Sequence, residues 1–294
     1  MKKIDFFIAG AAKSGTTALY NILKQHKDIF LPEFKEPHFF ASDLEKYKAH
    51  KSKSEYFKLY NDQGDKIWGD ASIFNMYSNV AIKNIIKHNE NAKIIIMLRK
   101  QTATVPSFHS QLLFTQDETE KNIEKAWDFN EKRLQGINIP KSCKCSKILD
   151  YKNIFKYAEQ LESIYSIVPS ENIHIVLHED FVQNNSNELF KIINFLGVRN
   201  ENLKNIISNE NEVNIFPIVS RILRHPPSFL KKTKRILIGD KGNKLYKKIL
   251  EYNSIVRARE PLSDKMKMKI LEEYVYDISK LELLLNRDLS IWKK

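Results

Sequence analysis

The segment FIAGAAKSGTTAL, residues 7–19, has the glycines and hydroxyl groups of a phosphate-binding loop. Gly10 and Gly15 are spaced as in the nucleotide-binding pattern G-x-x-x-x-G-K-[ST], and two threonines follow the second glycine. The lysine of that pattern belongs after the second glycine, but here it lies inside the loop, at Lys13. We expect backbone N–H groups at a helix start to bind an anion here, with Lys13 reaching a different part of the ligand than in triphosphatases.

A second group of candidate residues follows two other apolar segments. Arg99 comes directly after IIIML, residues 94–98, where a magnesium-dependent triphosphatase would carry an acidic residue. Asp180, in the segment IVLHED, is the remaining candidate for a metal ligand. A cation at the end of a strand favours a ligand whose charge is neutralised by the protein, so we expect no metal.

The elements that must position these residues alternate between strands and helices. Three short apolar segments, KIDFFIA (3–9), AKIIIML (92–98) and NIHIVLH (172–178), are typical of buried strands. NELFKIINFL (187–196) and the C-terminal segment have apolar residues at helical spacing, the latter at Met266, Ile270, Tyr274, Ile278, Leu281 and Leu285. This order predicts an α/β fold: a single domain, 1–294, with a central, mainly parallel sheet flanked by helices and a P-loop-like strand–loop–helix.

Composition limits the class of protein. The 294 residues are 42% hydrophobic and 11% aromatic, which is typical of a folded globular chain, and no apolar run is long enough to span a bilayer. Cys143 and Cys145 have no second pair nearby, so we expect reduced thiols in a cytoplasmic protein rather than a disulfide scaffold or a zinc site. We expect His26, His50, His88 and His225 at the surface, and structural roles for His109, His174 and His178.

The net charge of +12 is unevenly distributed along the chain. Residues 221–248 contain ten Lys and Arg residues and one acidic residue, Asp240. Such a segment is compatible with a nucleic-acid patch, a solvated basic face, or a lid over an anionic ligand.

Several of these segments together resemble the sulfotransferases that use 3′-phosphoadenosine 5′-phosphosulfate as donor. AAKSGTTAL resembles their 5′-phosphosulfate loop, and LRKQTATVPSFHSQ resembles their 3′-phosphate motif, with Arg99 and Ser107 eight positions apart. KEPHFF (35–40) and GDAS (69–72) are similar to motifs of the heparan and other glycan sulfotransferases, although Ala71 stands where many members carry lysine. The segments LHEDFVQNNSNELFKIINFLGV and LELLLNRDLSIW extend the resemblance through almost the whole chain.

The resemblance implies a role for each candidate residue. The loop, with Lys13, Ser14, Gly15, Thr16 and Thr17, would hold the 5′-phosphosulfate, and Lys13 would lie near the bridging oxygen, where charge develops as the bond breaks. Arg99 and Ser107 would bind the 3′-phosphate, and Arg221 is a candidate for a further donor contact. Glu36 would act as the general base toward an acceptor hydroxyl, expected on a carbohydrate. If residues 36–38 are extended, Glu36 and His38 face the same side and either could serve, with His38 favoured as a positioning group.

The sequence leaves two other classes of function open. A magnesium-dependent P-loop nucleotide kinase would need Asp180 as a metal ligand. A basic nucleic-acid-binding protein would use the segment 221–248. The sulfotransferase interpretation instead predicts a hydroxyl-bearing acceptor and no nucleic-acid partner, and the sequence does not indicate an oligomeric state.

Overall fold

The computed structural model describes residues 2–47, 49, 52–61, 64–205, 212–224 and 248–294. By its internal contacts the chain divides into two compact units. The first consists of Met1–Thr104, Lys152–Asn209 and Met268–Lys294, and the second of Val105–Tyr151 and Glu210–Lys267. The predicted domain bounds, 1–294, stay a prediction.

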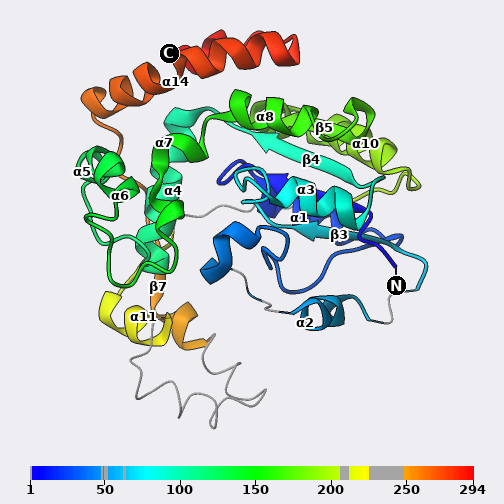
Figure 1. The fold of residues 1–294 in the computed structure, drawn as a ribbon, viewed down its shortest axis with the longest axis horizontal. Helices are drawn as coiled ribbons and strands as arrows, with labels where there is room; N and C mark the ends of the chain where they lie inside the picture. Colours follow the sequence, from blue (N-terminus) through cyan, green and yellow to red (C-terminus); the bar gives the residue numbers. More distant parts are fainter. Residues whose placement is uncertain (1, 48, 50–51, 62–63, 206–211, 225–247) are drawn as a thin grey trace. The chain divides into compact units, whose positions relative to one another are not determined.

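The first unit contains a five-stranded sheet with the strand order β2-β3-β1-β4-β5, in which all four pairings are parallel (Figure 1). Its strands are β1 (Phe6–Gly10), β2 (Ile29–Phe30), β3 (Ile67–Ala71), β4 (Lys93–Leu98) and β5 (Ile173–Leu177). The three predicted strands correspond to β1, β4 and β5. The predicted α/β class, with a central parallel sheet flanked by helices, is confirmed.

Helices connect the strands of this sheet, and three helices include residues of both units. Those of the first unit are α1 (Thr16–Leu23), α2 (Lys53–Phe57), α3 (Ala81–His88), α8 (Tyr157–Tyr165), α9 (His178–Gln183) and α10 (Asn185–Leu196). Three more run from one unit into the other: α4 (Gln101–Thr115), α7 (Tyr151–Ile154) and α14 (Asp264–Leu285). Short 3-10 helices occupy Ser42–Tyr47, Lys58–Tyr60, Ser146–Leu149, Ser170–Asn172 and Ser290–Lys293.

Both faces of the sheet are buried, as parallel sheets require. On one face, Ile8 of β1 belongs to one apolar cluster with Leu19 of α1 and Ile192 of α10. On the other face, the ring of Phe7 packs edge-on against Phe40, with 5.2 Å between the ring centres. The packing is close enough to dictate sequence: a Cβ atom on Gly69 would lie 2.2 Å from the ring of Phe6, so only glycine fits in β3 there. Five of the six apolar residues that the spacing of the C-terminal helix singles out are buried, Leu285 is half-buried, and the helix also buries Asp277.

The second unit contains α5 (Ile123–Asp128), α6 (Asn130–Leu134), α11 (Pro217–Arg224) and an antiparallel pair, β6 (Glu212–Asn214) with β7 (Ser254–Val256). A buried ion pair holds part of it together: Arg133 Nη1 lies 2.7 Å from Glu118 Oε2, which also accepts a hydrogen bond from the Tyr151 hydroxyl at 3.1 Å. Within the basic segment 221–248, residues 225–247 lie outside the described residues.

Several predictions on single residues can be compared with the structure. His26 is not at the surface: it is 2% exposed, its Nε2 bonds to the carbonyl of Arg199 at 2.8 Å, and its Nδ1 accepts from the Asp28 amide at 3.0 Å. His88 is half-buried and accepts a hydrogen bond from the Ile4 amide, while His50 and His225 lie outside the described residues. Cys143 and Cys145 are free, as predicted.

No helix in the described part of the chain has both the length and the apolar composition that crossing a membrane requires.

The cap of α8 makes a testable contribution to stability. Asp277 of α14 is buried and accepts a hydrogen bond from the amide of Ala158 at 3.1 Å. Burial raises the pKa of Asp277 to about 6, although backbone amides at the start of α8 act in the opposite direction. The folded state therefore keeps this proton to a higher pH than the unfolded chain, so the contribution of Asp277 to stability falls as the pH rises from about 4 to about 6.

We predict that Asp277→Asn, which stays uncharged, becomes more stable relative to wild type as the pH rises. The difference in unfolding free energy should grow by on the order of 1–2 kcal/mol between about pH 4 and pH 7. Urea unfolding of both proteins across this range measures it. A difference that is constant or shrinks with pH would contradict the proposed ionisation of Asp277.

Candidate active site

The predicted phosphate-binding loop connects β1 to α1. Gly15 caps α1 with a φ of 96°, a left-handed backbone that favours glycine, and the helix begins at Thr16 as expected. A Cβ atom on Gly15 would lie 3.1 Å from His178 Cδ2 and 3.3 Å from Met97 Cε. Ser14 is fully buried, and its hydroxyl has no hydrogen-bond partner among the described residues. The loop thus has the strand–loop–helix context of an anion site and a buried hydroxyl that a ligand could satisfy.

The ends of β4 and β5 bring charged groups to the same edge of the sheet. Arg99 follows β4 directly, is half-buried and forms no ion pair with the described residues. Burial lowers the pKa of Arg99, and the nearby carboxylate of Glu179 acts in the opposite direction. Burial, with a further effect of the charge of Arg99, lowers the pKa of His178 to about 4. Beside the loop, His178 is therefore neutral at neutral pH, and Arg99 supplies the positive charge.

The structure gives less information on the other two predicted donor-binding residues, Ser107 and Arg221. Ser107 is buried in α4 at 3% exposure, and not at the start of that helix. Arg221 lies in α11, and its side chain is outside the described part of the structure. Because both belong to the second unit, their joint action with Arg99 stays a prediction.

Glu36 and His38 come together, but not through the extended backbone that their spacing suggested. Both residues are left-handed, with φ of 63° and 50°, so residues 36–38 do not form an extended segment. His38 Nε2 nevertheless lies 3.7 Å from Glu36 Oε2. His38 is 2% exposed, whereas the Glu36 side chain is 32% exposed and can be reached from solvent.

Charges around Glu36 determine its ionisation. Burial raises the pKa of Glu36, but the ammonium group of Lys35 and the imidazole of His38 lower it by a larger amount. The resulting pKa of Glu36 is well below its usual range. Lys35 also donates a hydrogen bond to Glu36 Oε1. Glu36 is therefore a carboxylate at neutral pH, free of a proton as a general base must be.

The turn after β3 connects the glutamate segment to the phosphate-binding loop. The amide of Glu36 donates to the carbonyl of Ala71 at 3.0 Å, and the amide of His38 donates to Ser72 Oγ at 3.1 Å. Four residues later, the amide of Met76 donates to the carbonyl of Ala9, in β1, at 2.9 Å. One turn thus contacts both parts of the candidate site.

The three predicted catalytic residues share an uncommon backbone conformation. Lys13, Glu36 and His38 all have positive φ, among only six non-glycine residues that do so in the described part of the chain. For such residues this conformation costs on the order of 1 kcal/mol each and is concentrated at functional sites. This coincidence supports the choice of these residues independently of their motifs.

Asp180, the candidate metal ligand of a metal-dependent mechanism, interacts with another side chain. Asp180 Oδ1 lies 2.8 Å from Arg287 Nη2, in an ion pair. Within the described ranges no group of three or more His, Cys, Asp or Glu side chains could hold a metal ion.

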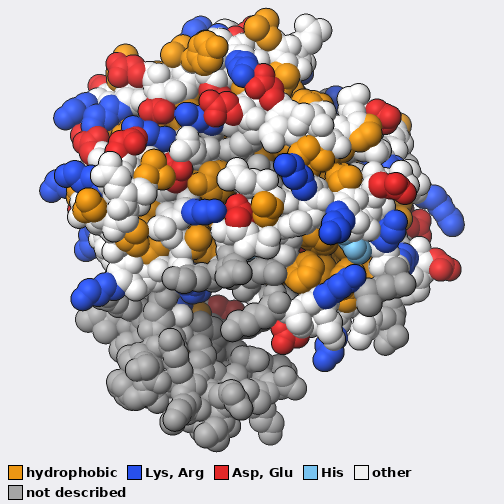
Figure 2. All heavy atoms as spheres, viewed as in Figure 1, with side chains coloured by type: hydrophobic (Ala, Val, Ile, Leu, Met, Phe, Trp, Pro, Cys, Tyr) orange, Lys and Arg blue, Asp and Glu red, His pale blue; other side chains and the backbone are white. Residues whose placement is uncertain are grey.

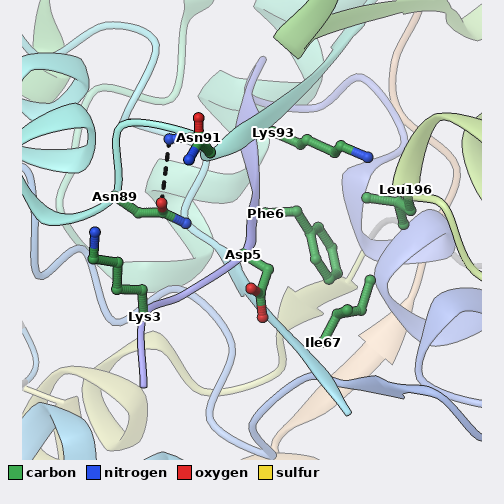
Figure 3. Close-up of a pocket in the computed structure, with 8 residues that line it drawn as sticks. All are labelled: Lys3, Asp5, Phe6, Ile67, Asn89, Asn91, Lys93 and Leu196. Atoms are coloured by element: carbon green, nitrogen blue, oxygen red, sulfur yellow. Dashed lines mark hydrogen bonds between the residues drawn. The ribbon is translucent and has the colours of Figure 1, made fainter. Parts of the chain in front are cut away.

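A pocket of about 450 Å³ lies at the opposite, amino-terminal edge of the sheet (Figure 3). Its lining is drawn from the starts of β1, β3 and β4 and their neighbours: Lys3, Asp5, Phe6, Ile67, Asn89, Asn91, Lys93 and Leu196. Two of its charged side chains are engaged in the fold, since Asp5 accepts from the Trp68 amide at 2.7 Å and Lys93 donates to the Phe195 carbonyl at 2.5 Å. Ligands of open parallel sheets bind at the carboxyl edge instead, where the loop lies.

The parallel sheet, the candidate phosphate-binding loop, the half-buried Arg99 and the ionised Glu36 are together compatible with group transfer from an anionic donor. A family model described as "Sulfotransferase domain" matches residues 3–211. The chain therefore belongs to the sulfotransferase domain family and is a sulfotransferase.

Comparison with one solved structure supports the fold, and two further structures show a weaker similarity. The sulfotransferase from Alicyclobacillus acidocaldarius is 20% identical and aligns over 100% of both chains with a TM-score of 0.73. Mouse sulfotransferase SULT7A1 complexed with PAP is 18% identical over 69% of this chain and 62% of that one, with a TM-score of 0.43. Retinol dehydratase in complex with androsterone and inactive cofactor PAP is 10% identical over 95% and 81%, with a TM-score of 0.47. No curated protein sequence matches the chain.

Proposed function

We propose that this sulfotransferase uses 3′-phosphoadenosine 5′-phosphosulfate as donor and transfers its sulfuryl group to a carbohydrate hydroxyl, as in the heparan and glycan branch. The observation that carries the proposal is the presence of two separate anion-binding features in the first unit. One is the loop, with the buried hydroxyl of Ser14, and the other is Arg99, which is half-buried and has no ion pair among the described residues. Two such features suit a donor that has a phosphosulfate at one end of its ribose and a separate phosphate at the other.

In this proposal the loop binds the donor's 5′ end through its backbone N–H groups and the hydroxyls of Ser14, Thr16 and Thr17. Arg99 binds the 3′-phosphate as a planar, charge-matched donor, with Ser107 and Arg221 as further contacts. Lys13 stabilises the negative charge that develops on the bridging oxygen. That charge exists only as the bond breaks, so this interaction lowers the barrier rather than merely strengthening binding.

The reaction is an in-line displacement at sulfur. The acceptor oxygen forms a bond to sulfur, the bond from sulfur to the phosphate oxygen breaks, and its electron pair stays on the phosphate. The acceptor proton passes to Glu36. Because the donor's anions and the loss of water near bound acceptor both raise a carboxylate's proton affinity, the low pKa of free Glu36 rises toward a useful value when substrates bind.

The two alternatives receive no support from the described residues. The kinase alternative needs Asp180, whose carboxylate is paired with Arg287. On the face in Figure 2, Lys and Arg side chains of the described residues are interspersed with Asp and Glu rather than gathered in one patch. We propose metal-independent turnover, so activity should persist in excess EDTA, whereas loss that magnesium restores would favour the kinase. The cytoplasmic location stays a prediction.

The donor assignment predicts a preference between two nucleotides. 3′,5′-Adenosine bisphosphate should bind far more tightly than 5′-AMP, because only the former carries the phosphate that Arg99 would bind. Arg99→Ala should weaken binding of the bisphosphate by about 1.5–3 kcal/mol and remove most of the preference. Arg199→Ala is the matched control, since Arg199 is an exposed arginine of the same unit. Equal affinities for the two nucleotides in calorimetry, in wild type and in Arg99→Ala, would refute the donor assignment.

The base assignment predicts different effects at Glu36 and His38. Glu36→Gln keeps the size and polarity of the side chain but takes no proton, so it should lower kcat by roughly 10²–10⁴ while donor binding is retained. His38→Ala should mainly raise the KM for the acceptor. Initial rates with labelled donor and a panel of mono- and oligosaccharides measure both. If His38→Ala abolishes kcat and Glu36→Gln stays within a few-fold of wild type, the two roles are reversed.

A further inference from the structure

Three side chains in the described part of the chain are at most 2% exposed and have every polar atom buried and without a hydrogen-bond partner. They are Ser14, His38 and Asn75. The approach of His38 Nε2 to Glu36 Oε2, at 3.7 Å, is too long for a hydrogen bond. An unpaired buried polar group destabilises the folded state, so such groups are rare and indicate a partner that the chain itself does not supply.

All three side chains belong to the surroundings of the candidate active site. Ser14 lies in the phosphate-binding loop, and His38 lies in the segment of the proposed base. Asn75 lies in the turn after β3, which contacts both of them through backbone and side-chain hydrogen bonds. Motifs in the sequence identified Ser14 and His38, whereas no motif identified Asn75. The structure therefore adds Asn75 to the residues whose polar groups are available to a substrate.

The neighbours of Asn75 place it between the loop and the base segment. Directly before it, the ring of Phe74 packs against the imidazole of His38, with 5.2 Å between the ring centres. Directly after it, Met76 packs against the start of the loop, so closely that a Cβ atom on Gly10 would lie 2.7 Å from Met76 Cβ. Asn75 is thus flanked by one contact to each half of the candidate site.

The chemistry of the amide selects the kind of ligand. Both Oδ1, an acceptor, and Nδ2, which carries two donor hydrogens, are unpaired in Asn75. Phosphate and sulfuryl oxygens only accept hydrogen bonds, so they could pair with Nδ2 but not with Oδ1. A hydroxyl both donates and accepts, and two neighbouring hydroxyls of a sugar ring can pair with both ends of one amide.

The strand order separates Asn75 from the nucleoside of the proposed donor. Arg99, which would hold the 3′-phosphate, follows β4, whereas Asn75 follows β3. Because β1 lies between β3 and β4 in the sheet, the two residues are on opposite sides of the loop that β1 leads into. Glu36 is on the side of Asn75, since its amide donates to the carbonyl of Ala71 at the end of β3. The acceptor, rather than the nucleoside, is therefore the substrate that Asn75 can bind.

We propose that Asn75 is an acceptor-binding residue, whose amide binds two neighbouring hydroxyls of a sugar beside the hydroxyl that gives its proton to Glu36. This inference rests on the proposed function, in which the acceptor is a carbohydrate. Asn75 and Ser14 are both 0% exposed, so each substrate must displace the side chains that cover its partner. The unpaired amide costs stability in the free protein and is satisfied only when the acceptor binds.

The stability of Asn75→Leu tests whether the amide is unpaired in the folded protein. Leucine has nearly the shape of asparagine but no polar atom, so Asn75→Leu should unfold at the same urea concentration as wild type or at a higher one. Asn89→Leu is the matched control, because Asn89 is buried in the same unit but fully paired. Its Nδ2 donates to the Ile4 carbonyl at 2.9 Å, and its Oδ1 accepts from the Asn91 amide at 3.2 Å. Asn89→Leu should therefore unfold at a lower urea concentration.

Initial rates with labelled donor and the most active sugar of the panel test the contact itself. Loss of two hydrogen bonds should raise the acceptor KM of Asn75→Leu by roughly 10- to 100-fold, whereas Asn89→Leu should keep the wild-type KM. Affinity for 3′,5′-adenosine bisphosphate should stay within about threefold of wild type in both variants, because the loop and Arg99 are unchanged.

Monodeoxy analogues of the same sugar identify the hydroxyls that Asn75 binds. Wild type should discriminate against at least one analogue by about 10-fold or more in kcat/KM, because the missing hydroxyl leaves the amide unpaired. Asn75→Leu should discriminate against that analogue by less than about threefold, because the partner of the hydroxyl is already absent.

Three results would overturn the role of Asn75. These are a wild-type acceptor KM in folded Asn75→Leu, a urea midpoint that falls as far as that of Asn89→Leu, or unchanged discrimination among the analogues. If leucine does not allow folding, Asn75→Ala decides the question by its KM and by the analogues. Failure of the proposed function gives a different pattern, because wild type itself would then transfer no sulfuryl group to any sugar.

Discussion

The site depends on the convergence of parallel strand ends at one edge of the sheet. β1 leads into the phosphate-binding loop, β4 into Arg99, and β5 into His178, while the turn after β3 supports residues 36–38. Because neighbouring strands run in the same direction, these four connections must meet at their carboxyl ends. The hydrogen bond from Met76 to Ala9 then fixes the β3 turn to β1. Residues far apart in the chain are thereby positioned by backbone contacts, which do not depend on flexible side chains.

Electrostatic interactions and burial determine the charge states of the ionisable groups at this edge of the sheet. Arg99 stays charged, and together with burial it keeps His178 neutral. Because the imidazole of His178 is neutral, it adds no further positive charge beside the loop. Lys13 and Arg99 then remain two separate cations for the two ends of the proposed donor. Glu36 is kept ionised by Lys35 and His38, although burial alone would favour its protonated form. Each group is thus in the charge state that its proposed role requires before substrates bind.

Much of the fold could be predicted because its signals are local. The apolar runs of β1, β4 and β5, the glycines of the loop and the periodic C-terminal helix are all readable from short segments. β3 gave a weaker signal, since Gly69 and Asp70 are residues that strands usually avoid. Its glycine is explained only by the ring of Phe6 in the neighbouring strand. His26 was misplaced for a similar reason, because its buried position depends on the carbonyl of Arg199, more than a hundred residues away.

The sequence indicated which residues belong to the candidate site, but not how they are arranged in space. The motif identified Glu36 and His38, and their spacing suggested an extended segment, yet two left-handed residues bring the side chains together instead. His178 was assigned a structural role because nothing in its neighbourhood along the chain indicates that β5 ends beside Gly15.

The environment of Asp70 likewise could not be predicted from the sequence. Its acidic side chain in a buried strand is an anomaly in the sequence, and only the structure shows the Tyr56 hydroxyl that donates a hydrogen bond to its Oδ2. Two residues further on, Ser72 Oγ accepts the amide of His38 and so supports the left-handed backbone there. The uncommon backbone of the proposed base segment is therefore sustained by contacts from the end of β3, which no local pattern within residues 35–40 predicts.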